Sequence, residues 1–320
     1  MSNKDIVQIR SLKKYFNTPH GKLHAVDDVT FCIEEGKTMG IVGESGCGKS
    51  TLGRMLVHLE ESTSGEIIFD DEDVTQLNNH DLKKYREKAQ IIFQDPYSSL
   101  DPRYTVESTI QEPLLISGKY RRKEAEEKTK ELMELVGIAP RLRLAYPHEL
   151  DGGRRQRVGI ARALALDPKF IVCDEPVSAL DVSIQAQVLN LLKKLQQERG
   201  LTYMFITHNL SVVKHISDNI CVMYLGQLVE TCPTKELFEK QLHPYTKALL
   251  SAIPSTNIHQ RNKRIVLNGE LKSPINPAPG CRFIKRCPYA CEECNRPQKL
   301  VEAESGHFVA CCKYKEINNM

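Results

Sequence analysis

The stretch that most constrains this chain is Thr38–Thr51, which reads TMGIVGESGCGKST. Its apolar start predicts a buried strand, and Gly43–Ser50 match the pattern G-x-x-x-x-G-K-[ST]. Glycines let the backbone curl so that successive N–H groups point at phosphate oxygens, and a following helix adds the positive end of its dipole. The pattern therefore predicts a phosphate-binding loop; a glycine-rich turn without a ligand is the alternative.

The polar and charged residues of this loop suit nucleotide chemistry. Lys49 can reach the β- and γ-phosphates, and the Ser50 hydroxyl suits a position beside Mg²⁺. The residues expected to contact a nucleotide are Gly43, Glu44, Ser45, Gly46, Cys47, Gly48, Lys49, Ser50 and Thr51.

Composition excludes several classes of protein. The 320 residues can form one large domain and one small one, and 41% hydrophobic with 27% charged residues is typical of a soluble globular protein. A net charge of +3 gives no reason to expect nucleic acid as a partner. No apolar run reaches the ~18 residues of a membrane span, and Met1–Arg10 lacks the apolar core of a signal peptide. We therefore expect the chain in the cytoplasm.

Apolar segments of strand length alternate with amphipathic helical segments, which predicts a mainly parallel, three-layer α/β core. Three strands end in polar side chains, at the sheet edge where α/β proteins place ligand contacts. These ends are Gln94 after Ala89–Phe93, Asp174 and Glu175 after Phe170–Cys173, and His208 after Tyr203–Thr207. Asp174 can hold Mg²⁺ through its water shell, and Glu175 can orient or deprotonate an attacking water. A strand-end amide, an acidic turn and a structural histidine are the plain alternatives.

The other segments add fewer constraints. Residues 95–165 are expected to be mainly helical, with a helix opening near Leu150–Val158, whose paired glycines could meet an anion. We expect a hairpin at Asn219–Val229 and a helix over Glu236–Ile253. The ring of Tyr15 could stack on an adenine face; a half-buried strand aromatic is the alternative.

With these residues assembled, the chain resembles an ATP-binding cassette (ABC) ATPase over roughly residues 5–255. The matching motifs are Tyr15 (A-loop), Gly43–Thr51 (Walker A), Gln94 (Q-loop), Leu150–Gln156 (signature), Phe170–Glu175 (Walker B), Ser178–Asp181 (D-loop) and His208 (switch histidine). The resemblance implies an α/β P-loop NTPase core over 1–255, with an inserted helical subdomain at about 95–165. A small Cys-rich segment over 256–320 would follow it.

The resemblance also implies roles for the site residues. Two cassettes would sandwich ATP, so that Asp151, Gly152 and Gly153 of one signature cap the nucleotide of the other cassette. Glu175 and His208 would carry hydrolysis, and Gln94 would link the nucleotide to membrane partners. Ligands for Mg²⁺ would come from Ser50, Gln94 and Asp174.

Several segments resemble a narrower group, the second ATPase of oligopeptide and dipeptide importers. They are Gln94–Arg103, Tyr146–His148, Asp174–Gln185, His243–Tyr245 and the tail from Ser273 to Cys311. This likeness implies an ATP-hydrolysing subunit that drives peptide import at the cytoplasmic face of the membrane. Its partners would be a second ATPase, two permease subunits and an extracellular solute-binding protein. Nickel importers share many of these segments. The alternative is therefore the same kind of ATPase subunit driving the import of nickel or another small solute.

One motif departs from the family. The signature usually reads Leu-Ser-Gly-Gly-Gln, whereas this chain has Leu150-Asp-Gly-Gly-Arg154. The family's serine donates a hydrogen bond to the γ-phosphate, and an ionised Asp151 has no proton to donate. We hypothesise a heterodimer with one fully competent site and one that binds ATP but hydrolyses it poorly. A helix cap at Asp151 is the plain explanation, and a subunit that only binds ATP is a further alternative.

The tail is rich in cysteine. Of the 11 cysteines, six lie between Cys281 and Cys312, and a dense terminal cluster in a reducing compartment indicates metal rather than disulfides. The importer resemblance maps a C-x5-C-x6-C pattern and a later cysteine onto Cys281, Cys287, Cys294 and Cys311, and implies a [4Fe–4S] cluster. Zinc, or a reduced segment without metal, is the alternative, and Cys291 and Cys312 are extra thiols. Far along the chain from the nucleotide motifs, such a cluster is expected to be structural or redox-sensing.

Overall fold

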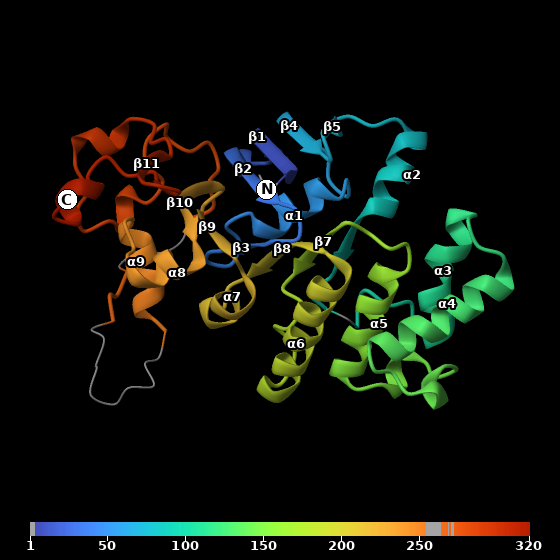
Figure 1. Cartoon of the computed structure of the whole chain (residues 1–320). Coiled ribbons are helices and arrows are strands. Elements are labelled where there is room, and N and C mark those ends of the chain that lie inside the picture. The colour runs from blue at the N-terminus through green and yellow to red at the C-terminus, as the bar shows by residue number, and fades with distance from the viewer. Residues whose placement is uncertain (1–3, 96, 254–263, 268, 270–271) are drawn as a thin grey trace.

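The computed structural model of the chain describes residues 4–95, 97–253, 264–267, 269 and 272–320 (Figure 1). Within these ranges the strands form a four-stranded and an eight-stranded sheet. The smaller sheet is antiparallel, with the order β2-β1-β4-β5. Its strands are β1 (Asp5–Thr18), β2 (Gly21–Glu34), β4 (Ser64–Phe69) and β5 (Glu72–Asp73).

The larger sheet has the order β11-β12-β10-β9-β3-β8-β7-β6. Five neighbouring strands are parallel, as predicted: β3 (Thr38–Val42), β6 (Ala89–Ile92), β7 (Phe170–Asp174), β8 (Thr202–Thr207) and β9 (Asn219–Tyr224). The predicted hairpin is formed by β9 and β10 (Gln227–Pro233), which pair antiparallel. Since the parallel strands all point the same way, their carboxyl ends meet at one edge.

Helices cover both faces of the larger sheet. On one face α1 (Lys49–Leu56) lies between the two sheets, and its Leu52, Met55 and Leu56 belong to a core shared by both (Figure 1). On the other face lie α6 (Val182–Arg199) and α7 (Leu210–Ile216). Gly200, with a left-handed backbone, ends α6.

The stretch from about 95 to 165 is mainly helical, as predicted. It contains α3 (Val106–Ser117), α4 (Arg122–Leu135) and α5 (Gly152–Leu164), with short 3₁₀ turns at Pro140–Leu142 and Pro147–Glu149. Before it comes α2 (Asn79–Lys88). In Figure 1 α3 and α4 lie at the end of the molecule opposite the tail. None of the helices in the described ranges combines the length and apolarity needed to cross a bilayer.

The helix predicted over Glu236–Ile253 is wrong as a single element. The structure has α8 (Thr234–Glu239) and α9 (Pro244–Ser251), separated by a short extended stretch. Pro244 has no N–H to continue a helix but suits a first turn, and the His243 ring accepts the Tyr245 N–H at 3.1 Å. The predicted boundary near residue 255 lies outside the described residues.

The tail joins the cassette through the sheet rather than standing apart. Its β12 (His307–Val309) pairs with β10 and with β11 (Val301–Glu304). Beneath this junction the buried carboxylate of Glu230 accepts the N–H groups of Leu242 and His243 and contacts His307 Nε2 at 2.8 Å. The remaining tail elements are short: 3₁₀ turns at Ile284–Arg286 and Glu292–Asn295, and α10 (Tyr314–Ile317).

Candidate active site

The loop between β3 and α1 is shaped by its glycines. Gly43 has φ 157°, and a Cβ there would lie 2.1 Å from the carbonyl oxygen of Met223. Gly48 has φ 102°, and its Cβ would lie 2.0 Å from the carbonyl oxygen of Ala25. A side chain at either position would clash with backbone atoms and would also be strained by the positive φ, so the loop requires glycine at both.

Lys49 is buried at the base of the loop, with 4% of its surface exposed. Its ammonium group donates to the carbonyl oxygens of Gly43 and Glu44, both at 2.9 Å. A lysine has three N–H donors, and the third makes only a long contact with Cys47 Sγ at 3.8 Å, which leaves capacity for an anion. Cys47 beside it is buried, and burial raises the pKa of its thiol, so it acts as a small apolar side chain.

A hydroxyl and a carboxylate link this loop to β7. Ser50 Oγ donates to Asp174 Oδ1 at 2.7 Å. Burial raises the pKa of Asp174, and the hydrogen bond from Ser50 opposes that rise. Two oxygen ligands held together beside a phosphate loop form a donor set that suits Mg²⁺.

Glu175 follows Asp174 with a left-handed backbone, φ 46°, a conformation that is uncommon outside glycine and concentrates at functional sites. Its Oε2 accepts a hydrogen bond from Gln94 Nε2 at 3.0 Å, and its Oε1 lies 3.1 Å from His208 Nδ1. The three side chains follow β6, β7 and β8, which are neighbours in the sheet. The edge predicted from the strand ends therefore brings these side chains into contact.

These groups surround one cavity of about 540 Å³. Its lining combines loop residues, strand ends and a few apolar side chains: Phe16, Leu23, Ala25, Ser45, Gly46, Gly48, Lys49, Ser50, Thr51, Gln94, Glu175, His208 and Pro274. Gly43, Glu44 and Cys47 shape the loop from behind this surface, and Asp174 stands behind Ser50.

Tyr15, the expected adenine contact, does not line this cavity. Its ring stacks on His24, with 3.9 Å between ring centroids, and its hydroxyl donates to Asp27. The next residue, Phe16, faces the cavity instead. Neighbouring residues of a strand point to opposite faces, so a shift of one position replaces the aromatic. The structure therefore places Phe16, and not Tyr15, on the lining of this cavity.

The signature residues Asp151, Gly152 and Gly153 also lie away from this cavity. Asp151 is the N-cap of α5: its Oδ1 accepts the Arg154 N–H at 2.7 Å, and its Oδ2 lies 3.4 Å from Arg154 Nε. The carboxylate therefore performs the capping that serine usually performs. The structure does not bring the signature to the phosphate loop of the same chain.

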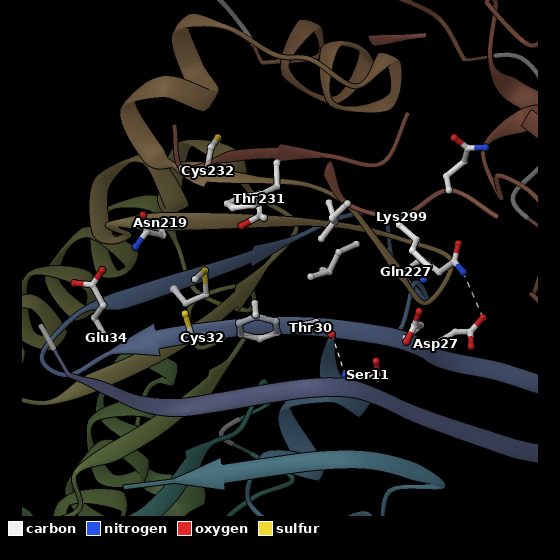
Figure 2. A pocket seen from close by; sticks show the side chains of 18 residues that line it. Ser11, Asp27, Thr30, Cys32, Glu34, Asn219, Gln227, Thr231, Cys232 and Lys299 are labelled. Carbon is white, nitrogen blue, oxygen red and sulfur yellow. Dashed lines mark hydrogen bonds between the residues drawn. The ribbon is translucent and has the colours of Figure 1, made fainter. Parts of the chain in front are cut away.

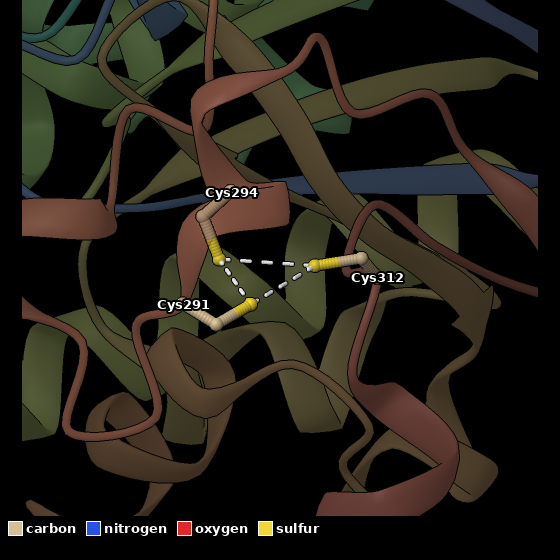
Figure 3. A group of neighbouring side chains, drawn as sticks. All are labelled: Cys291, Cys294 and Cys312. Atoms are coloured by element: carbon tan, nitrogen blue, oxygen red, sulfur yellow. Dashed lines mark hydrogen bonds between the residues drawn. The ribbon is translucent and has the colours of Figure 1, made fainter.

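The tail cysteines converge, but not in the predicted set alone. The sulfur atoms of Cys291, Cys294 and Cys312 form a triangle with sides of 3.6, 3.7 and 4.0 Å (Figure 3). All four predicted ligands line one small cavity together with one extra thiol: Cys281, Cys287, Cys294, Cys311 and Cys312. Cys294 and Cys312 belong to both groups, and of these two only Cys294 is in the predicted set.

The tail is also near the nucleotide residues in space. Pro274 lines the 540 Å³ cavity, and Arg286 pairs with Glu44 of the phosphate loop. The tail is therefore far from the nucleotide motifs along the chain but adjacent to them in space. A separate hollow of about 650 Å³ lies between β2, β10 and the tail (Figure 2). It shares no lining residue with the nucleotide cavity in the described part of the chain.

A glycine-shaped phosphate loop, a Ser–Asp pair and a strand-end glutamate on this two-sheet fold define an ATP-binding cassette ATPase. The sequence matches the ABC transporter family over residues 26–178 and the oligopeptide/dipeptide transporter C-terminal region over residues 229–294. In structure it is similar to a dimeric ATP-binding cassette in a post-hydrolysis state with ADP and Pi. The TM-score is 0.65 at 30% identity, covering 71% of this chain and 98% of that one.

Two curated relatives come from Bacillus subtilis. The putative oligopeptide transport ATP-binding protein YkfD is 51% identical, covering 98% of this chain and 97% of the relative. The oligopeptide transport ATP-binding protein AppF is 49% identical, covering 98% of each. The chain therefore belongs to the ABC transporter ATP-binding proteins of the oligopeptide/dipeptide type.

Proposed function

We propose that this chain hydrolyses ATP to drive the import of peptides through a membrane complex. The observation that carries the ATPase mechanism is the contact of Glu175 with both Gln94 and His208 over the nucleotide cavity. Lys49 and the loop N–H groups bind the phosphates, and Glu175 orients and deprotonates the attacking water. His208 contacts the γ-phosphate, and Gln94 links the nucleotide site to the membrane subunits. Mg²⁺ held by Ser50, Asp174 and Gln94 would neutralise charge on the phosphates.

Peptides are favoured as the solute because both B. subtilis relatives are described as oligopeptide transport proteins. The match to the oligopeptide/dipeptide C-terminal region supports the same class. Nickel or another small solute is the alternative, and no observation on this chain favours it.

The proposed assembly contains a second ATPase, two permease subunits and an extracellular solute-binding protein, with this chain peripheral at the cytoplasmic face. Support comes from the position of Asp151–Gly153 away from the chain's own cavity, which leaves the cap to a second cassette. We propose that the second cassette is a different chain with a normal signature. This chain's Walker motifs would then form the competent site, and its own Asp151 would face the partner's weaker site.

Replacing Asp151 by serine tests this asymmetry in the reconstituted complex. Serine caps a helix about as well as aspartate, so the fold should be unchanged, while the new hydroxyl can donate to a γ-phosphate. If the weaker site becomes competent, steady-state ATP hydrolysis should rise about twofold, since two sites then act in place of one. The measurement is phosphate release per complex, after co-purification with the tagged chain establishes the subunits present.

Asp81→Ser, a change in the first turn of α2, is the matched control and should leave the rate unchanged. An unchanged rate and stoichiometry for Asp151→Ser would contradict the asymmetric heterodimer. The ATPase itself would remain.

We propose further that the tail holds a thiolate-bound metal group. A [4Fe–4S] cluster is usually held by four thiolates, and Cys281, Cys287, Cys294 and Cys311 line one small cavity, which supports this set as its ligands. Such a cluster would supply a redox-active or structural cross-link. The triangle of Cys291, Cys294 and Cys312 favours zinc as a second candidate, since Zn–S bonds of about 2.3 Å separate tetrahedral sulfurs by about 3.8 Å. A cluster spreads its thiolates over different iron atoms instead.

Anaerobic purification followed by metal and sulfide analysis separates the two candidates. The cluster predicts iron and sulfide in equal amounts, lost in Cys281→Ser and retained in the matched double variant Cys291→Ser/Cys312→Ser. The other candidate predicts zinc that is lost in the double variant and retained in Cys281→Ser. That result would show that the triangle of Cys291, Cys294 and Cys312 binds the metal.

A further inference from the structure

An ion pair joins the tail to the phosphate loop. Arg286 Nη1 donates to Glu44 Oε2 at 2.7 Å, and Arg286 Nη2 donates to Glu44 Oε1 at 3.1 Å. The side chains are 10% and 27% exposed, so the pair is largely shielded from water. A two-pronged guanidinium–carboxylate contact of this kind is stronger and more directional than an ordinary surface pair.

Glu44 is held through its N–H, its carbonyl oxygen and its carboxylate. Its N–H donates to the Tyr245 hydroxyl at 3.0 Å, and its carbonyl oxygen accepts from Lys49 Nζ at 2.9 Å. Its carboxylate is the third point, held by Arg286. A change at the carboxylate therefore reaches the lysine expected to bind the phosphates.

Arg286 stands on a firmly packed segment. Phe283, with 1% exposure, packs against the rings of Tyr224 and Tyr245 at 5.3 and 5.5 Å between centroids. Arg282 donates to the carbonyl oxygens of His24 and Leu225 and pairs with Asp27. The segment is therefore anchored on both sheets, and Arg286 is presented to Glu44 without a mobile loop between them.

We propose that Arg286 is a positioning residue of the nucleotide site, by which the cysteine tail completes the phosphate loop. This inference rests on the proposed binding of ATP. An unpaired carboxylate at Glu44 would lie at the start of a loop that must accept several negative phosphate oxygens, and like charges repel. Arg286 neutralises that carboxylate and keeps it turned toward the tail. The phosphate loop thus depends on a residue that directly precedes Cys287.

The test is MgATP binding to the full-length protein, measured by calorimetry. Arg286→Gln should weaken binding about tenfold, the scale of losing one charge-assisted contact. The matched control Arg296→Gln, an exposed arginine of the same tail, should bind like the wild type. In the double variant Arg286→Gln/Glu44→Gln the repelling carboxylate is gone, so affinity should return to within about twofold of the wild type.

The recovery separates positioning by charge from a merely structural role. Equal affinities for wild type and Arg286→Gln would overturn the inference, and so would a loss that Glu44→Gln does not reverse. If Arg286→Gln does not fold, Arg286→Lys keeps the charge without the two-pronged geometry and should show a smaller loss. Failure of the wild type to bind MgATP would instead overturn the proposed function.

Discussion

Glu175→Gln is expected to lower ATP hydrolysis by the assembled transporter about a thousandfold, within the range for loss of a general base. The amide has the size of the carboxylate and can still hydrogen bond to Gln94 and His208, which lie 3.0 and 3.1 Å away. It cannot take a proton from water. MgATP binding should therefore stay within about twofold of the wild type, since no phosphate ligand is removed.

The measurement pairs phosphate release with equilibrium MgATP binding on the same preparation. Glu198→Gln, on the exposed face of α6 where the carboxylate contacts Lys194 across one helical turn, is the control and should retain full activity. Substantial hydrolysis by Glu175→Gln would remove this residue from the reaction. A parallel loss of binding would mean that the substitution damaged the cavity instead.

Lys49→Ala is expected to weaken MgATP binding by at least about a hundredfold, since it removes a buried cation from the phosphate site. It also removes the Lys49 hydrogen bonds to the carbonyl oxygens of Gly43 and Glu44, the second of which keeps the Cys47 N–H at 3.3 Å, so the loop loses support as well as charge. Hydrolysis should fall with binding at ordinary ATP concentrations.

Calorimetric titration with MgATP checks this result, together with a thermal unfolding scan that shows whether the loop alone is affected. Lys235→Ala, an exposed lysine of α8, is the control and should bind like the wild type. Tight binding of MgATP by Lys49→Ala would show that the glycine-rich turn does not serve as the phosphate site.

The phosphate loop and the strand-end residues could be predicted because their signals are local. Gly43 and Gly48 belong to one contiguous pattern of eight residues, which the sequence displays even though the backbone that leaves no room for a Cβ comes from the distant residues Met223 and Ala25. Apolar runs that end in Gln94, Glu175 and His208 mark the same edge of a parallel sheet, whatever the order of the strands.

The aromatic residue that lines the cavity could not be predicted in the same way. Alternation along a strand decides which face a residue occupies, and β1 has register shifts between Leu12 and Lys14 and between Lys14 and Tyr15. At each shift the extra residue lies in β2, so the pairing of this part of β1 is irregular. That Phe16 rather than Tyr15 lines the cavity therefore depends on pairing with β2, which no short stretch of sequence records.

The sequence by itself determined the class of fold, the phosphate loop and the residues that meet at the sheet edge, because backbone sterics and hydrophobic period act over a few neighbouring positions. Only the tertiary structure decided that the tail adds β12 to the sheet and that Arg286 pairs with Glu44 across 242 positions of chain. The sequence around a single arginine in a tail does not indicate which acidic residue it will pair with. That partner is selected by the packing of the whole domain, which brings distant backbone segments together.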